Sequence, residues 1–438
     1  MNIILLSGGS GQRLWPLSNN IRSKQFIKLF RNGDGNCESM LQRVCRQIYE
    51  VDSEANIVIA TGKSQVSEIY NQLGGGVAVC VEPERRNTFP AITLAVSYLA
   101  DIVGINKDEP VIVCPVDPYV DNDYFMSILR LEQIVRHNGE GIVLMGAEPV
   151  HPSEKYGYII PADNAELSLV IEFKEKPDIK TAEEYIERGA LWNCGVLGFR
   201  LDYLLEKVRA MIGFDGYDSL VRQYAKLPNV SFDYAILEHE KGIRVLRFGG
   251  AWKDIGTWNT FVEAMSESII GQAVLDDTCR DIHVVNELNI PILCMGLKDT
   301  VVVAGNDGIL VADKEQSSRI KPYVEQLDSR ARYAEKSWGT FVILDVQERA
   351  MTVKISIKAG KRLNYHSHNY RNEVWTVLSG DGESVVDGVH RMISAGDVVL
   401  LPKGCKHTVR AITELNIIEV QEGEEITVHD KVGYEQVL

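Results

Sequence analysis

The sequence predicts an α/β protein in three parts: an α/β domain with a mostly parallel sheet over residues 1–270, a short β-rich linker over 271–330 and a small jelly-roll β-barrel over 331–438. Two observations lead to this prediction. In the first part, short apolar runs alternate with segments of helical periodicity, which is typical of a parallel sheet covered on both faces. From about residue 335 onward, short strands are separated by glycine turns, which is typical of a small barrel.

The first part contains apolar runs that are candidate strands of one sheet. They are Ile3–Leu6, Ile57–Ala60, Val77–Val81, Val111–Val113 and Gly141–Met145. Between them, apolar residues at helical spacing predict helices around residues 40–48 and 92–99. Ligands of such sheets bind beyond the carboxyl ends of the strands. We therefore expect functional residues in the loops after Leu6, Val81 and Val113.

Composition excludes several classes of function. A net charge of −15 disfavours nonspecific binding of nucleic acid, which needs a basic face. No apolar run reaches the ~18–20 residues of a membrane span, so no membrane partner is expected. The first run has no basic segment before it and is expected to be a strand rather than a signal peptide. The eight cysteines include no C-x-x-C pair, which predicts free thiols and a cytoplasmic location.

A glycine-rich loop follows the first apolar run. Its glycines allow positive φ and close approach of backbone amides to an anion. Arg13 and Lys24 add two cations, so the stretch suits a triphosphate, although such a loop can also be a tight turn alone. Leu14 stands where a dinucleotide fingerprint has its third glycine, which disfavours a nicotinamide-dependent oxidoreductase. The residues of the loop are Gly8, Gly9, Ser10 and Gly11.

This opening resembles that of the sugar-1-phosphate nucleotidyltransferases. Residues 8–17 read G-G-S-G-Q-R-L-W-P-L, where the family has G-G-S-G-x-R-L-x-P-L, and Lys24 follows in a K-Q-F context. The Trp15 and K-Q-F variants are similar to the mannose-1-phosphate guanylyltransferase branch. The resemblance implies a Rossmann-like domain that transfers a nucleotidyl group from GTP to mannose 1-phosphate. Arg13 and Lys24 would then offset phosphate charge.

The loop after Val81 resembles the family's E-P-x-x-R-N-T-x-P-A segment, which lies near the nucleotide base. From the residues alone, Asn and Thr at a loop-to-helix junction could equally form a helix N-cap. The sequence offers no physical reason to select guanine over another base. The resemblance implies nucleotide contacts from Glu82, Arg86, Asn87 and Thr88.

Two aspartates are candidate ligands of one Mg²⁺ ion. Asp117 follows an apolar strand, where an acidic side chain facing phosphates is a natural Mg²⁺ ligand. The family's P-A-D-H reads P-V-D-P here, so Pro118 replaces the histidine. Asp254 lies in W-K-D-I-G-T-W, which resembles W-x-D-V-G-S-W; without the resemblance it could simply begin a turn. The resemblance implies that Asp117 and Asp254 hold the metal together.

Three later segments resemble those that hold the sugar phosphate in the family. They are Tyr156–Ile159 (Y-G-Y-I), Phe173–Pro177 (F-x-E-K-P) and Trp192–Gly195, where Cys194 replaces the serine of W-N-S-G. Taken singly, each could be strand and turn punctuation. Their order implies that the sugar phosphate contacts Gly157, Glu175, Lys176 and Asn193.

The C-terminal part carries the cupin pattern. Residues 360–380 read G-x5-H-x-H-x4-E-x6-G, and residues 396–407 read G-x5-P-x-G-x2-H. Side chains two apart on a strand point to the same face, so two of the histidines can share the barrel interior. Three imidazoles and a carboxylate suit Zn²⁺, Mn²⁺, Fe²⁺, Co²⁺ or Ni²⁺. The predicted ligands are His366, His368, Glu373 and His407.

The barrel also resembles the type II phosphomannose isomerase domain, which interconverts mannose 6-phosphate and fructose 6-phosphate. Arg371 falls on that family's R-x-E arginine, a candidate for catalysis or phosphate binding. The family's R-P-W-G reads K-S-W-G at residues 336–339, and His366 stands where a glutamine ligand is common. The general base is not identifiable from the sequence.

Alternatives stay open at this point. The transferase could act on another sugar 1-phosphate, such as a heptose, because Pro118 and Cys194 depart from the family pattern. The cupin could sense a sugar or hold a dimer without turnover. The linker is expected to pack between domains and to contribute to a homodimer. Lys314–Leu327 is predicted to be a connecting helix.

Overall fold

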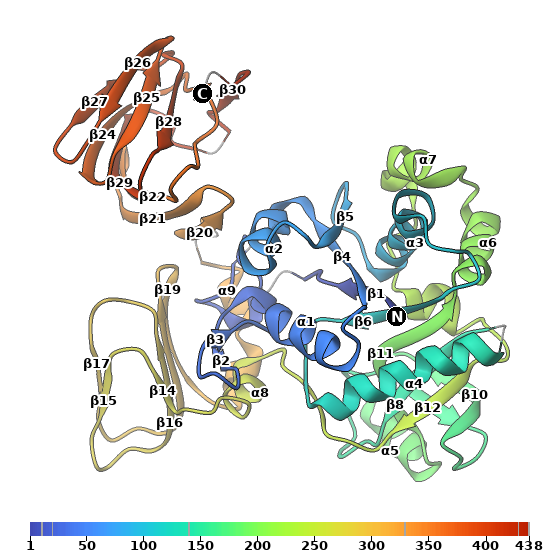
Figure 1. Ribbon diagram of the computed structural model, residues 1–438. Coiled ribbons are helices and arrows are strands. Elements are labelled where there is room, and N and C mark those ends of the chain that lie inside the picture. The colour runs from blue at the N-terminus through green and yellow to red at the C-terminus, as the bar shows by residue number, and fades with distance from the viewer. Residues whose placement is uncertain (10–11, 20, 139–140, 328–329, 428, 437–438) are drawn as a thin grey trace. The chain divides into compact units, whose positions relative to one another are not determined.

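The computed structural model describes residues 1–9, 12–19, 21–138, 141–327, 330–427 and 429–436 (Figure 1). By its contacts the chain divides into two compact units. The first unit consists of Met1–Ser10 and Ser23–Glu267, and the second of Gly11–Arg22 and Ser268–Leu438. No helix among the described residues is long and apolar enough to cross a membrane.

The first unit is built on a nine-stranded sheet. The pairing is parallel among its first four strands and between β8 and β12, and antiparallel on both sides of β11 and at β10. All five predicted strands are confirmed. In spatial order the strands are β5 (Ala78–Glu82), β4 (Asn56–Gly62), β1 (Asn2–Leu6), β6 (Pro110–Pro115), β11 (Leu191–Arg200), β8 (Val143–Ala147), β12 (Arg244–Phe248), β10 (Leu167–Lys174) and β9 (Tyr158–Pro161).

Alternating side chains of the sheet enter two separate cores. In β1, Ile4 packs in one core, whereas Ile3 and Leu5 pack in the other, as the two-residue period of a strand requires. Helices cover both faces, and both predicted helices are confirmed as α1 and α3. One face carries α1 (Met40–Val51), α2 (Val66–Leu73) and α4 (Asn122–Asn138), and the other carries α3 (Thr88–Tyr98), α6 (Leu201–Ile212) and α7 (Gly216–Gln223).

Shorter elements complete the first unit and shape its loops. The 3-10 turns are η2 (Lys24–Phe26), η3 (Lys63–Gln65) and η5 (Tyr224–Lys226), and the π-helical turns are η4 (Leu99–Val103) and η6 (Asp233–Leu237). The remaining strands and helices are β2 (Phe30–Arg31), β3 (Cys37–Glu38), β7 (Pro118–Val120), α5 (Ile179–Glu187), β13 (Trp252–Asp254) and α8 (Trp258–Val262).

The second unit begins with strands that form a parallel coil. The pairs β14–β16, β16–β18 and β15–β17 are parallel, and β19 closes the coil against β18 in antiparallel fashion. The β-rich character predicted for residues 271–330 is confirmed by these strands. The strands are β14 (Ile269–Ile270), β15 (Ala273–Leu275), β16 (Arg280–Asn286), β17 (Ile292–Cys294), β18 (Lys298–Gly305) and β19 (Gly308–Asp313).

The predicted connecting helix over Lys314–Leu327 is wrong. The structure has only two short pieces there, η7 (Gln316–Arg319) and α9 (Lys321–Val324). Pro322 lacks a backbone N–H and its ring crowds the carbonyl of the preceding turn, so a continuous helix through this point is disfavoured. A further short 3-10 turn of this unit, η1 (Gln12–Leu14), comes from the N-terminal end of the chain.

The rest of the second unit is a barrel of two antiparallel sheets, which confirms the predicted fold class. Trp375, Val409 and Ile417 are buried between the sheets. One sheet contains β20 (Tyr333–Lys336), β21 (Gly339–Val346), β22 (Ala350–Ile357), β29 (Leu415–Gly423), β24 (Arg371–Ser379) and β27 (Val398–Leu401). The other contains β26 (Val389–Ile393), β25 (Gly382–Val386), β28 (His407–Ala411), β23 (His366–Ser367) and β30 (Val432–Gly433).

Candidate active site and metal centre

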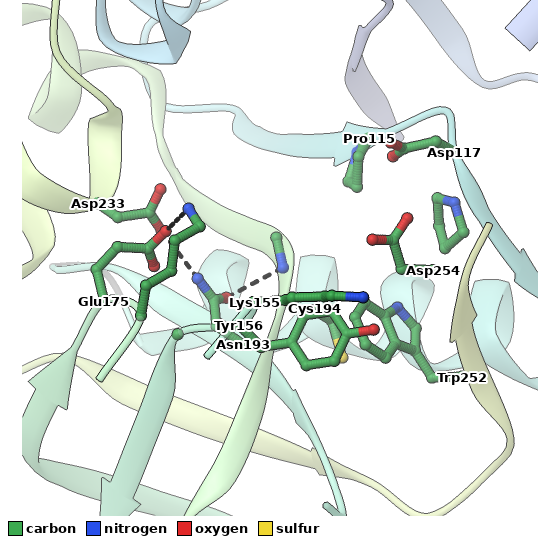
Figure 2. A pocket seen from close by; sticks show the side chains of 14 residues that line it. Pro115, Asp117, Lys155, Tyr156, Glu175, Asn193, Cys194, Asp233, Trp252 and Asp254 are labelled. Atoms are coloured by element: carbon green, nitrogen blue, oxygen red, sulfur yellow. Dashed lines mark hydrogen bonds and ion pairs between the residues drawn. The ribbon is translucent and has the colours of Figure 1, made fainter. Parts of the chain in front are cut away.

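A pocket of about 300 Å³ opens in the first unit beside the carboxyl end of β6. Figure 2 shows Asp117 and Asp254 facing each other on one side and Glu175 with Asp233 on the other. Two predicted sets of site residues thus meet in one cavity, although they lie far apart in the sequence. The predicted residues that line it are Asp117, Gly157, Glu175, Lys176, Asn193 and Asp254.

Lys24 joins the two aspartates. Asp117 follows β6, and Asp254 ends β13, which pairs with β7 so that Asp254 lies opposite Pro118. The Lys24 ammonium lies 2.8 Å from Asp117 Oδ2 and 3.9 Å from Asp254 Oδ1, and it donates a hydrogen bond to the Ile255 carbonyl at 3.2 Å. The two aspartates line the pocket, and the Lys24 ammonium contacts both of them.

Electrostatics keep Asp117 in its anionic form. Loss of solvation inside the pocket opposes ionisation, but the neighbouring Lys24 outweighs this effect and lowers the pKa of Asp117 below its usual value. The side chains of Asp117 and Asp254 remain 38% and 35% exposed, so their oxygens are accessible from the cavity. Paired accessible carboxylates are the hard oxygen ligands that Mg²⁺ prefers, and the residues present therefore fit that ion.

The opposite end of the pocket is polar and closely packed. Asn193 Nδ2 donates to Asp233 Oδ1 at 2.8 Å, and Lys176 forms an ion pair with Glu175. A Cβ atom on Gly157 would lie 2.7 Å from Glu175 Oε2, so any side chain there would displace this carboxylate from its present position. Lys176 has a φ of 45°, a strained left-handed conformation of the kind that concentrates at binding sites.

Asp233 is a pocket residue to which the sequence analysis assigned no role. Burial, reinforced by repulsion from Glu175, raises its pKa to about 6. Asp233 opens the π-helical turn η6 directly after Phe232, which is fully buried. An acidic residue adjoining a buried aromatic one was the available signal, but the partner Asn193 is 40 residues away in sequence.

Aromatic side chains form a further wall that sequence reasoning missed. The ring centroid of Tyr156 lies 4.8 Å from that of Trp192 and 5.2 Å from that of Trp252. Burial raises the pKa of Tyr156 to about 12, so its hydroxyl stays protonated. Lys155, next to it in the chain, also lines the pocket. The arrangement offers apolar ring faces and hydrogen-bonding groups together, as sugar-sized ligands require.

Two of the predicted nucleotide-binding residues have protein partners. Glu82 is buried and accepts a hydrogen bond from the Tyr224 hydroxyl at 2.7 Å, and burial raises its pKa. The guanidinium of Arg86 donates to the carbonyls of Leu227, at 2.6 Å, and Ala225. These contacts hold the segment after α7 against the loop after β5.

Asn87 has the helix-capping geometry that was one of the two interpretations of its loop. It is the N-cap residue of α3, and its side chain accepts a hydrogen bond from the Thr88 amide at 2.8 Å. The Thr88 hydroxyl accepts from the Phe232 amide at 2.8 Å. Nucleotide contacts by Asn87 and Thr88 stay predictions beside these structural roles.

The glycine-rich loop is described in part. Gly9 has a φ of 142°, and its carbonyl accepts a hydrogen bond from the Ser23 hydroxyl at 3.1 Å. Gly8 is exposed, and a side chain there would meet no atom within 4 Å, so its backbone is open to a ligand. Arg13 is exposed on η1. Two further predicted residues of the loop, Ser10 and Gly11, lie outside the described residues.

In the barrel, the four predicted metal ligands come together. One ligand atom from each lies within 4.8 Å of the others, and all four side chains are buried. His366 and His368 come from β23 and the turn after it, Glu373 from β24 and His407 from β28. The spacing of the cupin pattern therefore predicted correctly that these four side chains lie together.

Backbone carbonyls set the tautomers of the three histidines. The Nδ1 atom of His366 lies 2.6 Å from the Asn364 carbonyl, and that of His407 lies 3.2 Å from the Cys405 carbonyl. His368 Nδ1 bonds to the Asp430 carbonyl. An Nδ1 atom that donates to a carbonyl leaves the lone pair of the ring on Nε2, as metal-binding imidazoles require.

The ligand atoms and the protonation states of the cluster suit a divalent metal ion. Glu373 Oε2 and His407 Nε2 are both buried and lie 3.3 Å from each other, and neither has a hydrogen bond to any other described group. Burial lowers the pKa of His366 to about 2, so this imidazole is neutral. Burial raises the pKa of Glu373, but the proximity of His407 and other nearby charges prevail and lower it to about 2. A neutral imidazole and a carboxylate are the forms that bind divalent transition metals.

Arg371 reaches into the same cluster. Its Nε donates to Glu373 Oε1 at 2.8 Å, its Nη2 lies 3.1 Å from His368 Nε2, and its Nη1 donates to the Thr427 carbonyl at 3.0 Å. Only 8% of its side chain is exposed. The guanidinium therefore contacts two of the four predicted metal ligands.

Comparison with known proteins agrees with this geometry. A putative mannose-1-phosphate guanylyltransferase of Vibrio cholerae serotype O1 is 29% identical over 99% of this chain and 99% of its own length. The xanthan biosynthesis protein XanB of Xanthomonas campestris pv. campestris is 29% identical over 99% and 97%. A crystal structure described as mannose-1-phosphate geranyltransferase from Thermus thermophilus superposes with a TM-score of 0.63 at 25% identity, covering 75% of this chain and 98% of that one.

Family models match both functional regions. The model described as mannose-6-phosphate isomerase C-terminal matches residues 325–436, the barrel with its four-ligand cluster. The model described as nucleotidyl transferase matches residues 2–269, which is more than half of the chain and contains the pocket. The resemblance inferred from the glycine-rich opening is thereby confirmed, and the chain belongs to the nucleotidyl transferase family.

Proposed function

We propose that the protein transfers a guanylyl group from GTP to mannose 1-phosphate, giving GDP-mannose and pyrophosphate for surface polysaccharide synthesis. The observation that carries the proposal is the contact of Lys24 with Asp117 and Asp254, two residues of a pocket that Glu175, Lys176 and Asn193 also line. The relatives from Vibrio and Xanthomonas, a putative mannose-1-phosphate guanylyltransferase and a xanthan biosynthesis protein, support this substrate and pathway class.

In this proposal a phosphate oxygen of the sugar phosphate attacks the α-phosphorus of GTP in line, and pyrophosphate leaves. No protein nucleophile is needed, so catalysis consists of positioning and charge stabilisation. Asp117 and Asp254 would hold a Mg²⁺ ion, which neutralises phosphate charge when bound. Lys24 stabilises the transferring phosphoryl group, Arg13 the leaving pyrophosphate, and the amides of residues 8–11 cradle the triphosphate.

Substrate recognition is divided between two sets of residues. We propose that Gly157, Glu175, Lys176 and Asn193 hold mannose 1-phosphate, with the Tyr156 ring beneath the sugar. The ammonium of Lys176 and the amide of Asn193 are donors, and Glu175 is an acceptor, for hydroxyl or phosphate oxygens. Contacts to the nucleotide are proposed for Glu82, Arg86, Asn87 and Thr88.

Pyrophosphate release tests this function directly. The purified protein is incubated with Mg²⁺, mannose 1-phosphate and each of GTP, ATP, CTP and UTP in turn. Release with GTP alone is the expected result. Release with a different nucleotide would overturn the base assignment. Release only with another sugar 1-phosphate, such as a heptose 1-phosphate, would favour the alternative transferase.

A second activity is proposed for the barrel, namely interconversion of mannose 6-phosphate and fructose 6-phosphate. It is supported by the four-ligand cluster with Arg371 inside it and by the isomerase family model. The ion is proposed to be Zn²⁺, Mn²⁺, Fe²⁺, Co²⁺ or Ni²⁺. Formation of fructose 6-phosphate by metal-loaded protein is the test. A fully loaded protein without turnover would favour a sugar-sensing or dimerising barrel.

The domain boundaries, the oligomeric state and the cellular location are also proposals. We infer three domains at 1–270, 271–330 and 331–438, with the linker contributing to a homodimer. The eight cysteines are unpaired thiols in the structure, which supports a cytoplasmic location. Neither nucleic acid nor a membrane is a proposed partner.

A further inference from the structure

The chain segment that carries Arg13 is built into the second unit, together with the parallel coil and the barrel. Leu14 and Leu17 in this segment are each only 1% exposed. A Cβ on Gly305 would lie 3.0 Å from Leu17, and a Cβ on Gly308 would lie 2.3 Å from the ring of Trp15. Two glycines at the β18–β19 turn therefore make room for the segment.

Asn19 is the point where this segment is tied down. Its Nδ2 donates to Asp307 Oδ2 at 2.6 Å and to the Tyr333 carbonyl at 3.2 Å. Its Oδ1 accepts from the amides of Ile21, at 2.8 Å, and Arg22, at 2.7 Å. One side-chain amide thus shapes its own turn and connects it to two distant stretches of chain.

Asp307 is the partner of Asn19 in this contact, which we call the junction. While Oδ2 accepts from Asn19, Oδ1 accepts from the Arg332 amide at 2.6 Å. The carboxylate therefore links the turn after β18 to the residue that precedes the barrel strand β20. Charge-assisted hydrogen bonds of this length are stronger than those between neutral groups.

Arg22 adds a second tie beside the first. Its Nη1 and Nη2 bond to the two oxygens of Glu287 at 2.7 and 2.9 Å, a bidentate geometry. The guanidinium carbon also lies 5.3 Å from the centre of the Tyr333 ring. Tyr333 thus receives contacts from both Asn19 and Arg22.

We propose that Asp307 is a positioning residue for nucleotidyl transfer: through Asn19 it fixes the backbone that carries Arg13. Turnover then depends on a carboxylate that lies outside residues 2–269, the region matched by the nucleotidyl transferase model. This inference rests on the proposed role of Arg13. It differs from a purely structural role, in which the junction would stabilise the second unit and leave turnover unchanged.

Isosteric exchange tests the junction without removing volume. In Asp307→Asn, Asn19 Nδ2 faces a second NH2 group, and in Asn19→Asp two carboxylates face each other. The double variant Asn19→Asp with Asp307→Asn restores a donor–acceptor pair of reversed direction. Glu348→Gln, at an exposed turn of the barrel, is the matched control for loss of a charge.

Three readouts are taken on the full-length protein: the kcat for pyrophosphate release, the KM for mannose 1-phosphate, and amide hydrogen exchange of residues 12–22. We expect each single variant to lower kcat by about tenfold, a factor in keeping with one disrupted charge-assisted hydrogen bond. The KM should stay near that of the wild type while exchange in 12–22 becomes faster. The double variant should recover part of both losses, because it restores the bond between positions 19 and 307 but leaves a carboxylate facing the Tyr333 carbonyl. Glu348→Gln should change neither quantity.

Unchanged kcat in both single variants, with faster exchange, would overturn the inference and leave a structural role only. A double variant with a kcat no higher than that of Asn19→Asp alone would overturn it too. Wild-type protein that releases no pyrophosphate with any sugar 1-phosphate would refute the proposed function itself, and the inference with it. If the wild type is active and both single variants keep its kcat, the inference is refuted but the proposed function is not.

Discussion

The ammonium of Lys24 forms a 2.8 Å ion pair with Asp117, a residue 93 positions later in the sequence (117 − 24). In Lys24→Ala we expect kcat for pyrophosphate release to fall about 100-fold or more, the loss typical of removing one preorganised charge-stabilising donor. The fold should be intact, because this lysine is at the pocket rather than in a core. Lys28→Ala, an exposed lysine four residues away, is the control. Rates like the wild type in Lys24→Ala would remove the proposed role.

Asp117→Ala and Asp117→Asn should abolish turnover, since neither side chain supplies the charge that Mg²⁺ binding needs. Both variants keep Lys24, so the pocket becomes more positive and cannot attract the cation. Turnover measured against Mg²⁺ concentration checks this, with Asp123→Asn in the first turn of α4 as a control. If excess Mg²⁺ restored the full rate of Asp117→Ala, Asp117 would not be a ligand.

Asp233 should make stability depend on pH. Its pKa rises from an ordinary value near 4 to about 6 on folding, so between these values the folded state binds more protons than the unfolded state. Its contribution to stability is therefore lost as pH rises through this window. Asp233→Asn should raise the free energy of unfolding at pH 7.5 relative to pH 4 by on the order of 2 kcal/mol.

Denaturant unfolding of both proteins at the two pH values measures this difference. Asp163→Asn, an exposed carboxylate outside the pocket, is the control and should show no such gain at high pH. An equal effect of Asp233→Asn at both pH values would show that the carboxyl does not titrate in this range.

The metal centre should contribute to the stability of the barrel. His407→Ala removes one of four ligands, so metal content should drop well below one ion per chain. The melting temperature of the His407→Ala variant should then no longer respond to added metal or chelator. In the wild type, a metal at a hundred times its Kd adds about 3 kcal/mol. His390→Ala, a histidine that is 49% exposed on β26, is the control. Full metal content in His407→Ala would contradict the assignment.

The strands of the first unit and the metal cluster were predictable because each depends on local patterns. Apolar runs such as Ile3–Leu6 define buried strands on their own. The His366–His368 pair needs only the two-residue period of an extended chain to place both rings on one face. The pocket was predictable in outline, since Asp117 and Asp254 were identified by motif.

Other features depend on tertiary contacts that no local pattern encodes. The bond from Asn193 to Asp233 and the bond from Asn19 to Asp307 span 40 and 288 positions. The residue type of Asn87 likewise does not distinguish a helix cap from a ligand contact, because asparagine suits both. The failed helix at Lys314–Leu327 shows the reverse case, in which a charged stretch suggested regularity and Pro322 interrupted it.

The distance in sequence between Asn19 and Asp307 has a consequence for synthesis. The N-terminal segment leaves the ribosome among the first residues, but its anchors near 287, 307 and 333 are made far later. At about 5–20 residues per second, the 288 intervening positions take roughly 15–60 s to translate. The nine-stranded sheet is itself complete only after β12, which ends at Phe248, so all of its strands are translated before Asp307. The proposed role of Arg13 therefore predicts that a new chain becomes competent for nucleotidyl transfer only near the end of translation.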